Sequence, residues 1–160
     1  NGPLFYITNT NGYINLTDVD VSAASGILLK AEGNDRWGTS GSNGGTAALT
    51  ADEQTLGGNI LADEISSVSV ELKNGSSLTG AINADNTAKS ASLTLDSSSA
   101  WTVTADSYLT CLVDADGIDG NTIKNIIGNG HTVYYDAANC SALGGQTYSL
   151  VGGGELKPSN

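Results

Sequence analysis

Basic residues are scarce in this sequence. Six Lys and Arg stand against 17 Asp and Glu, the formal net charge is −11, and Arg36 is the only arginine. Nucleic-acid binding requires clusters of Lys and Arg that neutralise phosphates, and binding to an anionic membrane surface requires them too. Both partners are therefore disfavoured, and cations or neutral polymers are favoured. No apolar run approaches the roughly 20 residues of a membrane-spanning helix.

Cysteine and histidine are also nearly missing, with only Cys111, Cys140 and His131 present. This set is too small for a structural zinc site. The two cysteines either are two small buried residues or form a disulfide, which would indicate an oxidising compartment. One histidine and no Gly-x-Ser-x-Gly segment give catalysis little support. We therefore predict that the protein is not an enzyme.

Apolar residues are below the usual globular share, at 39%, while 21 residues are glycine. Such a chain cannot fill a wide core, and no stretch has the apolar spacing of a helix. It can fill a thin core in which each turn of chain buries a few aliphatic side chains. Short segments that alternate apolar and small polar residues, such as 68–72 and 91–95, predict strands with one face inward.

The most informative positive feature is a repeat. The segment 60–64 returns as 82–86 and again as 103–107, and 68–72 returns as 91–95. A period near 22 residues without intervening helices is typical of a β-solenoid. We predict an all-β fold: one right-handed parallel β-helix spanning 1–160, with three parallel sheets and about six coils. Because an apolar strand-like segment, 4–7, opens the chain without a polar cap, we expect a piece of a longer protein.

Two segments interrupt the repeat. Residues 33–45 read GNDRWGTSGSNGG, which predicts a loop inserted into the solenoid, and residues 114–121 read DADGIDGN, which predicts an irregular acidic loop. Insertions in solenoids often lie on one face and bind ligands. The first insertion makes Arg36 and Trp37 candidate ligand-binding residues, because an exposed indole can stack on a sugar ring. The alternative is that Trp37 packs against the solenoid.

Tyr135 is a third candidate for ligand binding. Adjacent residues of a strand point to opposite faces, so only one ring of the pair Tyr134 and Tyr135 lies outside. Trp101 aligns with Leu78 in the repeat, which predicts that this second tryptophan either lies in the core or closes the side of a coil.

Two sets of aspartates are candidate Ca²⁺ ligands, because Ca²⁺ prefers carboxylate oxygens. Asp114, Asp116 and Asp119 concentrate such oxygens in one loop, and the other interpretation is a solvated acidic turn. Asp63, Asp85 and Asp106 occupy equivalent places in the repeat and would form a column across coils about 4.8 Å apart. The alternative for that column is a series of turn caps that accept backbone N–H groups.

The segments 78–110, 126–136 and 143–158, together with 5–21 and 36–45, resemble secreted bacterial right-handed parallel β-helix proteins. These are adhesin-like surface proteins, some of which are described as carbohydrate-binding. The resemblance covers nearly all of the chain and implies a solenoid in a secreted or cell-surface setting. A fold by itself does not determine a function.

We therefore expect a non-catalytic extracellular module that binds polysaccharide or another surface polymer, with Ca²⁺ as a candidate cofactor. One alternative is a structural subunit of a fibre or filament that assembles through exposed strand edges at the solenoid ends. A second alternative is a polysaccharide lyase. It is disfavoured because the few basic residues are scattered.

Overall fold

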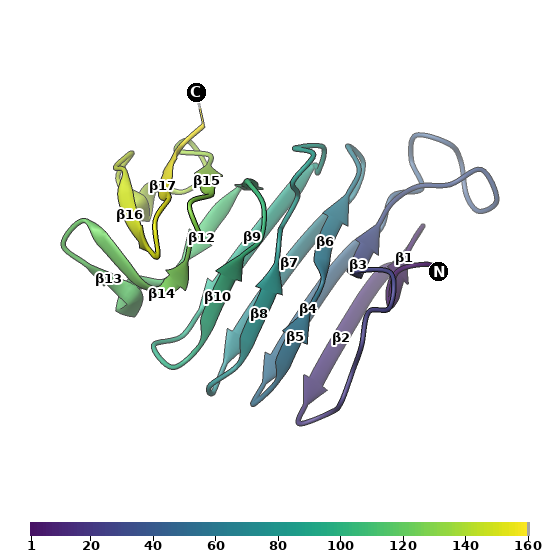
Figure 1. Cartoon of the computed structure of the whole chain (residues 1–160). Coiled ribbons are helices and arrows are strands. Elements are labelled where there is room, and N and C mark those ends of the chain that lie inside the picture. Colours follow the sequence, from purple (N-terminus) through teal and green to yellow (C-terminus); the bar gives the residue numbers. More distant parts are fainter. Residues whose placement is uncertain (160) are drawn as a thin grey trace.

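The computed structural model describes residues 1–159 and has a β-solenoid of about seven turns, with successive turns roughly 23 residues apart. Figure 1 shows the turns following one another from the N-terminus to the C-terminus. The described residues contain no α-helix, only two short 3₁₀ turns, η1 (Ala115–Gly117) and η2 (Ser141–Leu143). The predicted all-β solenoid is therefore confirmed, with about one turn more than expected.

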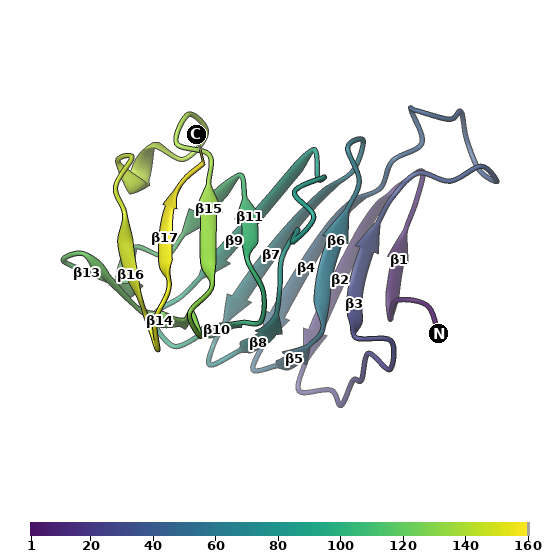
Figure 2. The same cartoon turned by 45° about the horizontal axis from the view of Figure 1, so that its top comes forward.

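The first face of the solenoid is built from six short strands and one bridging residue. The strands are β1 (Phe5–Ile7), β3 (Ile27–Ala31), β6 (Asn59–Ala62), β11 (Ser107–Leu109), β15 (Thr132–Tyr135) and β17 (Glu155–Pro158). Between β6 and β11, Ile82 pairs with Ile60 and accepts a hydrogen bond from the backbone N–H of Tyr108. Figure 2 shows these strands side by side along the length of the molecule. This face therefore runs through all the turns.

The second face is a five-stranded parallel sheet. Its strands are β2 (Asn11–Thr17), β4 (Thr46–Asp52), β7 (Ser67–Lys73), β9 (Ser90–Leu95) and β12 (Cys111–Val113). Val68 pairs with Ala91 and Leu72 with Leu95, which confirms the register predicted from the repeat. The inward positions Ile14, Leu49, Val70, Leu93 and Leu112 follow one another across the sheet and form one apolar column.

The third face consists of β5 (Thr55–Gly57), β8 (Ser77–Gly80), β10 (Ala100–Val103), β14 (Thr122–Ile127) and β16 (Tyr148–Val151). The short β13 (Ile118–Asp119) pairs with the edge of β14. At the C-terminal end β16 pairs antiparallel with β17, so a hairpin joins the third face to the first. This hairpin departs from the parallel stacking of the earlier turns.

Trp101 lies in the core, one of the two positions that the repeat predicted. It pairs with Leu78 on β8 and is 0% exposed. Its indole N–H donates to the carbonyl of Gly80 at 2.9 Å. A buried indole N–H without an acceptor would be costly, so this bond lets the largest side chain of the chain fill the thin interior.

A disulfide joins Cys111 to Cys140, with a sulfur–sulfur distance of 2.05 Å. Cys111 begins β12, the last strand of the second face, and Cys140 lies in the segment 136–147, which takes the place of a strand in the following turn. The sequence left this pairing open. The bond fastens the irregular last turns to the regular part of the solenoid.

Candidate functional site

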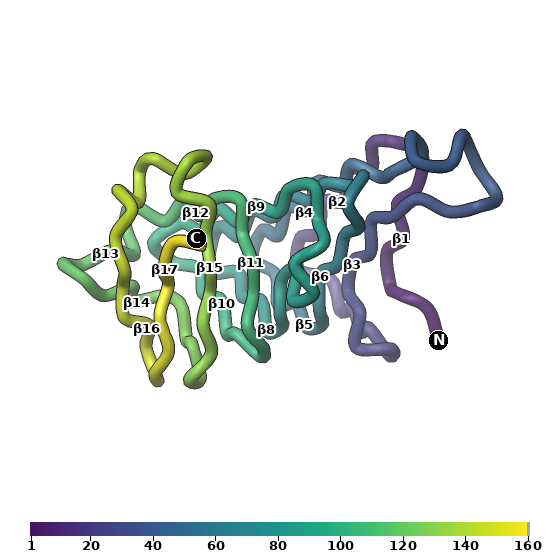
Figure 3. Tube along the Cα trace, turned by 90° about the horizontal axis from the view of Figure 1, so that it is seen from above, coloured from purple at the N-terminus to yellow at the C-terminus, as the bar shows by residue number. Residues whose placement is uncertain are grey.

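The segment 32–45, between β3 and β4, projects from the body of the solenoid near its N-terminal end, as Figure 3 shows. Hydrogen bonds fix its conformation. The amide of Asn43 is 1% exposed and donates to the carbonyls of Asn34 and Trp37, and the Asn34 side chain accepts from the backbone N–H groups of Arg36 and Trp37. The projecting segment is therefore an ordered support for the side chains at its tip.

Trp37 is 57% exposed and lies on this support. With Tyr6, Asn34, Asp35 and Arg36 it borders a surface hollow of about 430 Å³. The Tyr6 hydroxyl accepts from the Asn34 amide at 3.3 Å, which connects the projecting segment to the first face. We call this hollow the Trp37 hollow. It brings together two of the predicted residues, Arg36 and Trp37, and adds Tyr6, which the sequence did not single out.

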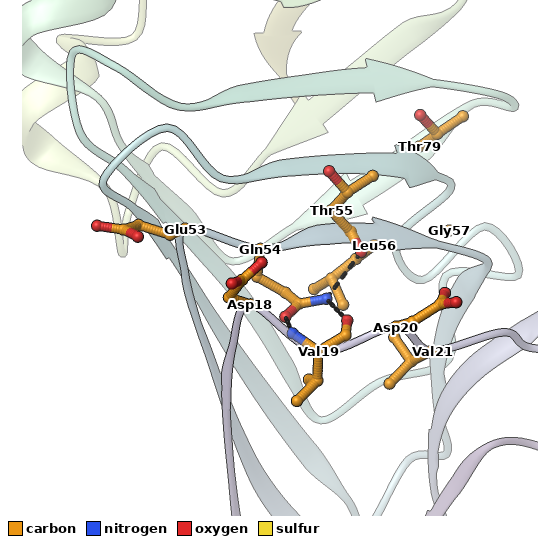
Figure 4. Close-up of a pocket in the computed structure, with 10 residues that line it drawn as sticks. All are labelled: Asp18, Val19, Asp20, Val21, Glu53, Gln54, Thr55, Leu56, Gly57 and Thr79. Carbon is orange, nitrogen blue, oxygen red and sulfur yellow. Dashed lines mark hydrogen bonds between the residues drawn. The ribbon is translucent and has the colours of Figure 1, made fainter.

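Another hollow, about 560 Å³, lies beside β5 and is shown in Figure 4. In the first turn, residues 18–26 form no strand on the third face. The side chain of Gln54 supplies hydrogen bonds to this segment in place of a neighbouring strand. Its side-chain amide accepts from the N–H of Val19 at 2.9 Å and donates to the carbonyl of Val19 at 2.7 Å. These bonds use both ends of the buried amide. The hollow is thus the space left by a missing strand, bordered by exposed carboxylates of Asp18, Asp20 and Glu53.

Tyr135 is not available to a ligand. It is 0% exposed, and its hydroxyl donates to the carbonyl of Gln146 at 2.7 Å. Burial raises the pKa of this phenol. The prediction chose the wrong member of the pair, because alternation along β15 places Tyr135 inside and Tyr134 outside.

The outward ring of Tyr134 belongs to a cluster that the sequence analysis missed. Tyr134 pairs with Tyr108 on β11 and with Lys157 on β17. The two tyrosine rings stack with centroids 4.8 Å apart and an angle of 9° between their planes. The Lys157 ammonium lies 5.6 Å from the centroid of Tyr134. The signal in the sequence was a separation of 26 residues between the tyrosines, but only the register shows that they are neighbours.

The predicted column of Asp63, Asp85 and Asp106 does not form. Val103 pairs with Gly80 rather than with Ile82, so Asp106 is not equivalent to Asp85. The turn that follows Ile82 contains the extra loop 83–89, and the backbone N–H of Lys89, not Asp85, reaches the carbonyl of Asp63. The extra loop 83–89 interrupts the structural repeat, although the sequence of 82–86 resembles that of 60–64.

Two of these aspartates instead accept backbone hydrogen bonds. Asp63 accepts from the N–H groups of Gly33, at 2.8 Å, and Ile65, at 3.3 Å, and so holds the start of the projecting segment. Asp106 accepts from the N–H of Thr132 at 2.9 Å. His131 lies near it, with Nδ1 3.7 Å from the carboxylate. Asp63 and Asp106 therefore connect neighbouring turns.

The aspartates of the acidic loop have different surroundings. Asp119 is exposed and forms an ion pair with Lys124 at 2.6 Å, and Asp116 is exposed. Asp114 is only 2% exposed, and burial raises the pKa of this carboxyl to about 6. Across residues 1–159, no group of three or more His, Cys, Asp or Glu side chains is arranged to hold a metal ion. The loop does not gather the three carboxylates around one point.

The arrangement as a whole provides outward-facing aromatic side chains at two places: Trp37 on the projecting segment beside Tyr6 of the first face, and Tyr108 stacked on Tyr134 on the first face. Within the described part of the chain, no helix has the length and hydropathy needed to cross a membrane. In comparisons with known proteins, no family, no curated protein and no solved structure matches this chain.

Proposed function

We propose that the protein is a non-catalytic extracellular module that binds a neutral polysaccharide at the Trp37 hollow. The observation that carries this proposal is the exposed indole of Trp37 on a segment fixed by Asn34 and Asn43. A planar apolar ring beside amide, carboxylate and guanidinium groups suits a sugar, which has an apolar ring face and hydroxyls at its edge. Because the support is already ordered, binding orders little chain.

Charge and redox state support the rest of the proposal. A net charge of −11 repels anionic polymers and leaves neutral ones favoured. The Cys111–Cys140 disulfide is typical of proteins in oxidising compartments, which supports a secreted or cell-surface location. The resemblance to bacterial surface proteins points the same way.

Retention on insoluble neutral glycans tests the proposal. We expect wild-type protein to be retained on at least one glycan and Trp37→Ala to bind about tenfold more weakly, because one aromatic stacking contact is lost. Tyr13→Ala is the matched control, since Tyr13 is 77% exposed on β2 but does not border the Trp37 hollow. Equal loss in both variants, or no retention of wild type on any glycan, would contradict the proposal. Steady release of new reducing ends would contradict its non-catalytic part.

A further inference from the structure

The first face carries another hollow, about 280 Å³ in volume, further along the chain toward the C-terminus than the Trp37 hollow. Tyr108 and Tyr134 border it, together with Asn86, Lys89 and Asp136. We call it the tyrosine hollow. Stacked tyrosines on neighbouring strands stabilise a sheet, and this alone would explain the ring pair. It does not explain why the pair borders a polar hollow with a fixed opposite wall.

The opposite wall is the inserted loop 83–89, and Asn83 holds it. The Asn83 side chain is 5% exposed, accepts from the N–H groups of Thr87 and Ala88, both at 3.0 Å, and donates to the carbonyl of Tyr108 at 3.1 Å. The Thr87 hydroxyl donates to the carbonyl of Ala62 at 2.7 Å. The loop is thus bound both to the preceding turn and to the tyrosine strand. Its exposed Asn86 and Lys89 are left to face a ligand.

The two hollows lie along one line. Tyr6 projects from β1, and Tyr134 projects from β15 on the same face, five turns further along. At about 4.8 Å per turn, the two rings are about 24 Å apart along the solenoid axis. A linear chain lying along the first face would therefore reach both aromatic groups.

We propose that the tyrosine hollow is a second binding site for a neutral linear polysaccharide, which lies along the first face and contacts both hollows. Tyr108 and Tyr134 supply apolar ring surface and phenol groups for one sugar, while Asn86 and Lys89 donate to its hydroxyls. This inference extends the proposed function from one contact to two. Two contacts on one chain raise the affinity for polymer well above that for a short piece, because the second contact becomes intramolecular.

Titration calorimetry with short oligosaccharides, paired with affinity electrophoresis in the parent polymer, tests this site. The probes are a soluble β-glucan, a galactomannan and a xylan, each with its own trisaccharide. We expect wild type to bind two trisaccharides and to bind the matching polymer at least tenfold more tightly. Tyr134→Ala and Trp37→Ala should each bind one trisaccharide and lose most of that preference for polymer.

Thr132→Ala is the matched control for Tyr134→Ala, because Thr132 projects outward from the same strand but does not border the hollow. Lys89→Ala perturbs the opposite wall without removing the stacked rings, so the site stays testable if Tyr134→Ala fails to fold. If Tyr134→Ala and Lys89→Ala both bind as wild type does, the second site is wrong and the Trp37 proposal stands. If Trp37→Ala binds as wild type does while Tyr134→Ala and Lys89→Ala bind more weakly, the Trp37 proposal is wrong and the tyrosine hollow stands as a binding site.

Discussion

At the scale of single residues, Asp114 has the most unusual surroundings. Asn125 donates from its side-chain amide to one carboxylate oxygen of Asp114 at 3.0 Å. The other carboxylate oxygen and the amide oxygen of Asn125 are both buried without a hydrogen-bond partner. Two buried acceptors are unfavourable together, and a proton on Asp114 would supply the donor they lack. This geometry agrees with the raised pKa of the carboxyl, which burial causes and the nearby charge of Asp116 increases.

We expect Asp114 to make stability depend on pH. Its pKa is about 6 in the folded state against an ordinary value of 3.8, so the fold binds this proton more tightly than the unfolded chain does. The contribution of this proton to the free energy of unfolding is therefore fully present below about pH 4 and is lost as the pH rises through about 6. This contribution is at most roughly 3 kcal/mol. In Asp114→Asn an amide donor replaces the proton at every pH. The melting temperature of the variant should rise above that of wild type between pH 4 and pH 7, and parallel curves would refute the effect.

Wild type and Asp114→Asn, together with two further variants, also test the calcium prediction. If Ca²⁺ rather than a proton balances the charge of the acidic loop, CaCl₂ at pH 7 should raise the melting temperature of wild type more than NaCl at equal ionic strength does. Asp114→Asn and Asp116→Asn should then remove that difference. If the response instead depended on Asp85→Asn, the ion would lie away from this loop. An equal response to both salts would exclude calcium.

At the scale of elements, the segment 136–147 departs from the strand pattern of the earlier turns. Its sequence has no strand pattern, and it is held by the Cys111–Cys140 disulfide and by the hydroxyls of Tyr135 and Tyr148, which donate to the carbonyls of Gln146 and Leu143. The covalent bond closes a loop with a sequence separation of 29 residues. Such a constraint mainly destabilises the unfolded chain.

We expect reduction of this disulfide to lower the free energy of unfolding by about 3–4 kcal/mol, the amount expected for a loop of this length. For a domain of this size the melting temperature should fall by about 10 °C. Thermal unfolding with and without a reductant measures this change. The double variant Cys111→Ser with Cys140→Ser is the control and should not respond to reductant. An unchanged melting temperature in reduced wild type would show that packing alone holds the last turns.

At the scale of the whole molecule, the two ends of the solenoid differ. At the N-terminal end β1 and β2 each pair with one strand only, and Tyr13 and Leu4 are exposed there. At the C-terminal end the second face stops at β12, and the antiparallel pair β16 and β17 follows. The edge of the second face at this end is the three-residue strand β12, which matches less than half of the seven-residue strand β2 of a second molecule.

We accordingly expect no head-to-tail filament, the alternative function that the sequence suggested. Light scattering coupled to size-exclusion chromatography should give no growth of mass as protein concentration increases, and negative-stain images should show no fibres. Open-ended growth into fibres would contradict this expectation, because heterologous contacts that do not close produce filaments.

The sequence by itself determined the solenoid and much of its register. The alternation of apolar and polar residues in 68–72 and 91–95 was sufficient to predict how these two strands pair. A strand has a side-chain period of two, so only one register places the apolar residues of both strands in the core. The same logic placed Trp101 opposite Leu78. Every turn buries apolar side chains at equivalent positions, so the sequence contains a periodic pattern of apolar residues.

Only the tertiary structure decided which residues meet on the surface. Outward positions carry no apolar constraint, so an extra loop such as 83–89 shifts the repeat without a visible signal, and the column of Asp63, Asp85 and Asp106 was lost in this way. Alternation required one ring of Tyr134 and Tyr135 to face outward, but the inward choice depends on the register of β15 against its neighbours. The stack of Tyr108 on Tyr134 exists because the register of β11 against β15 pairs two residues that are 26 positions apart in the sequence.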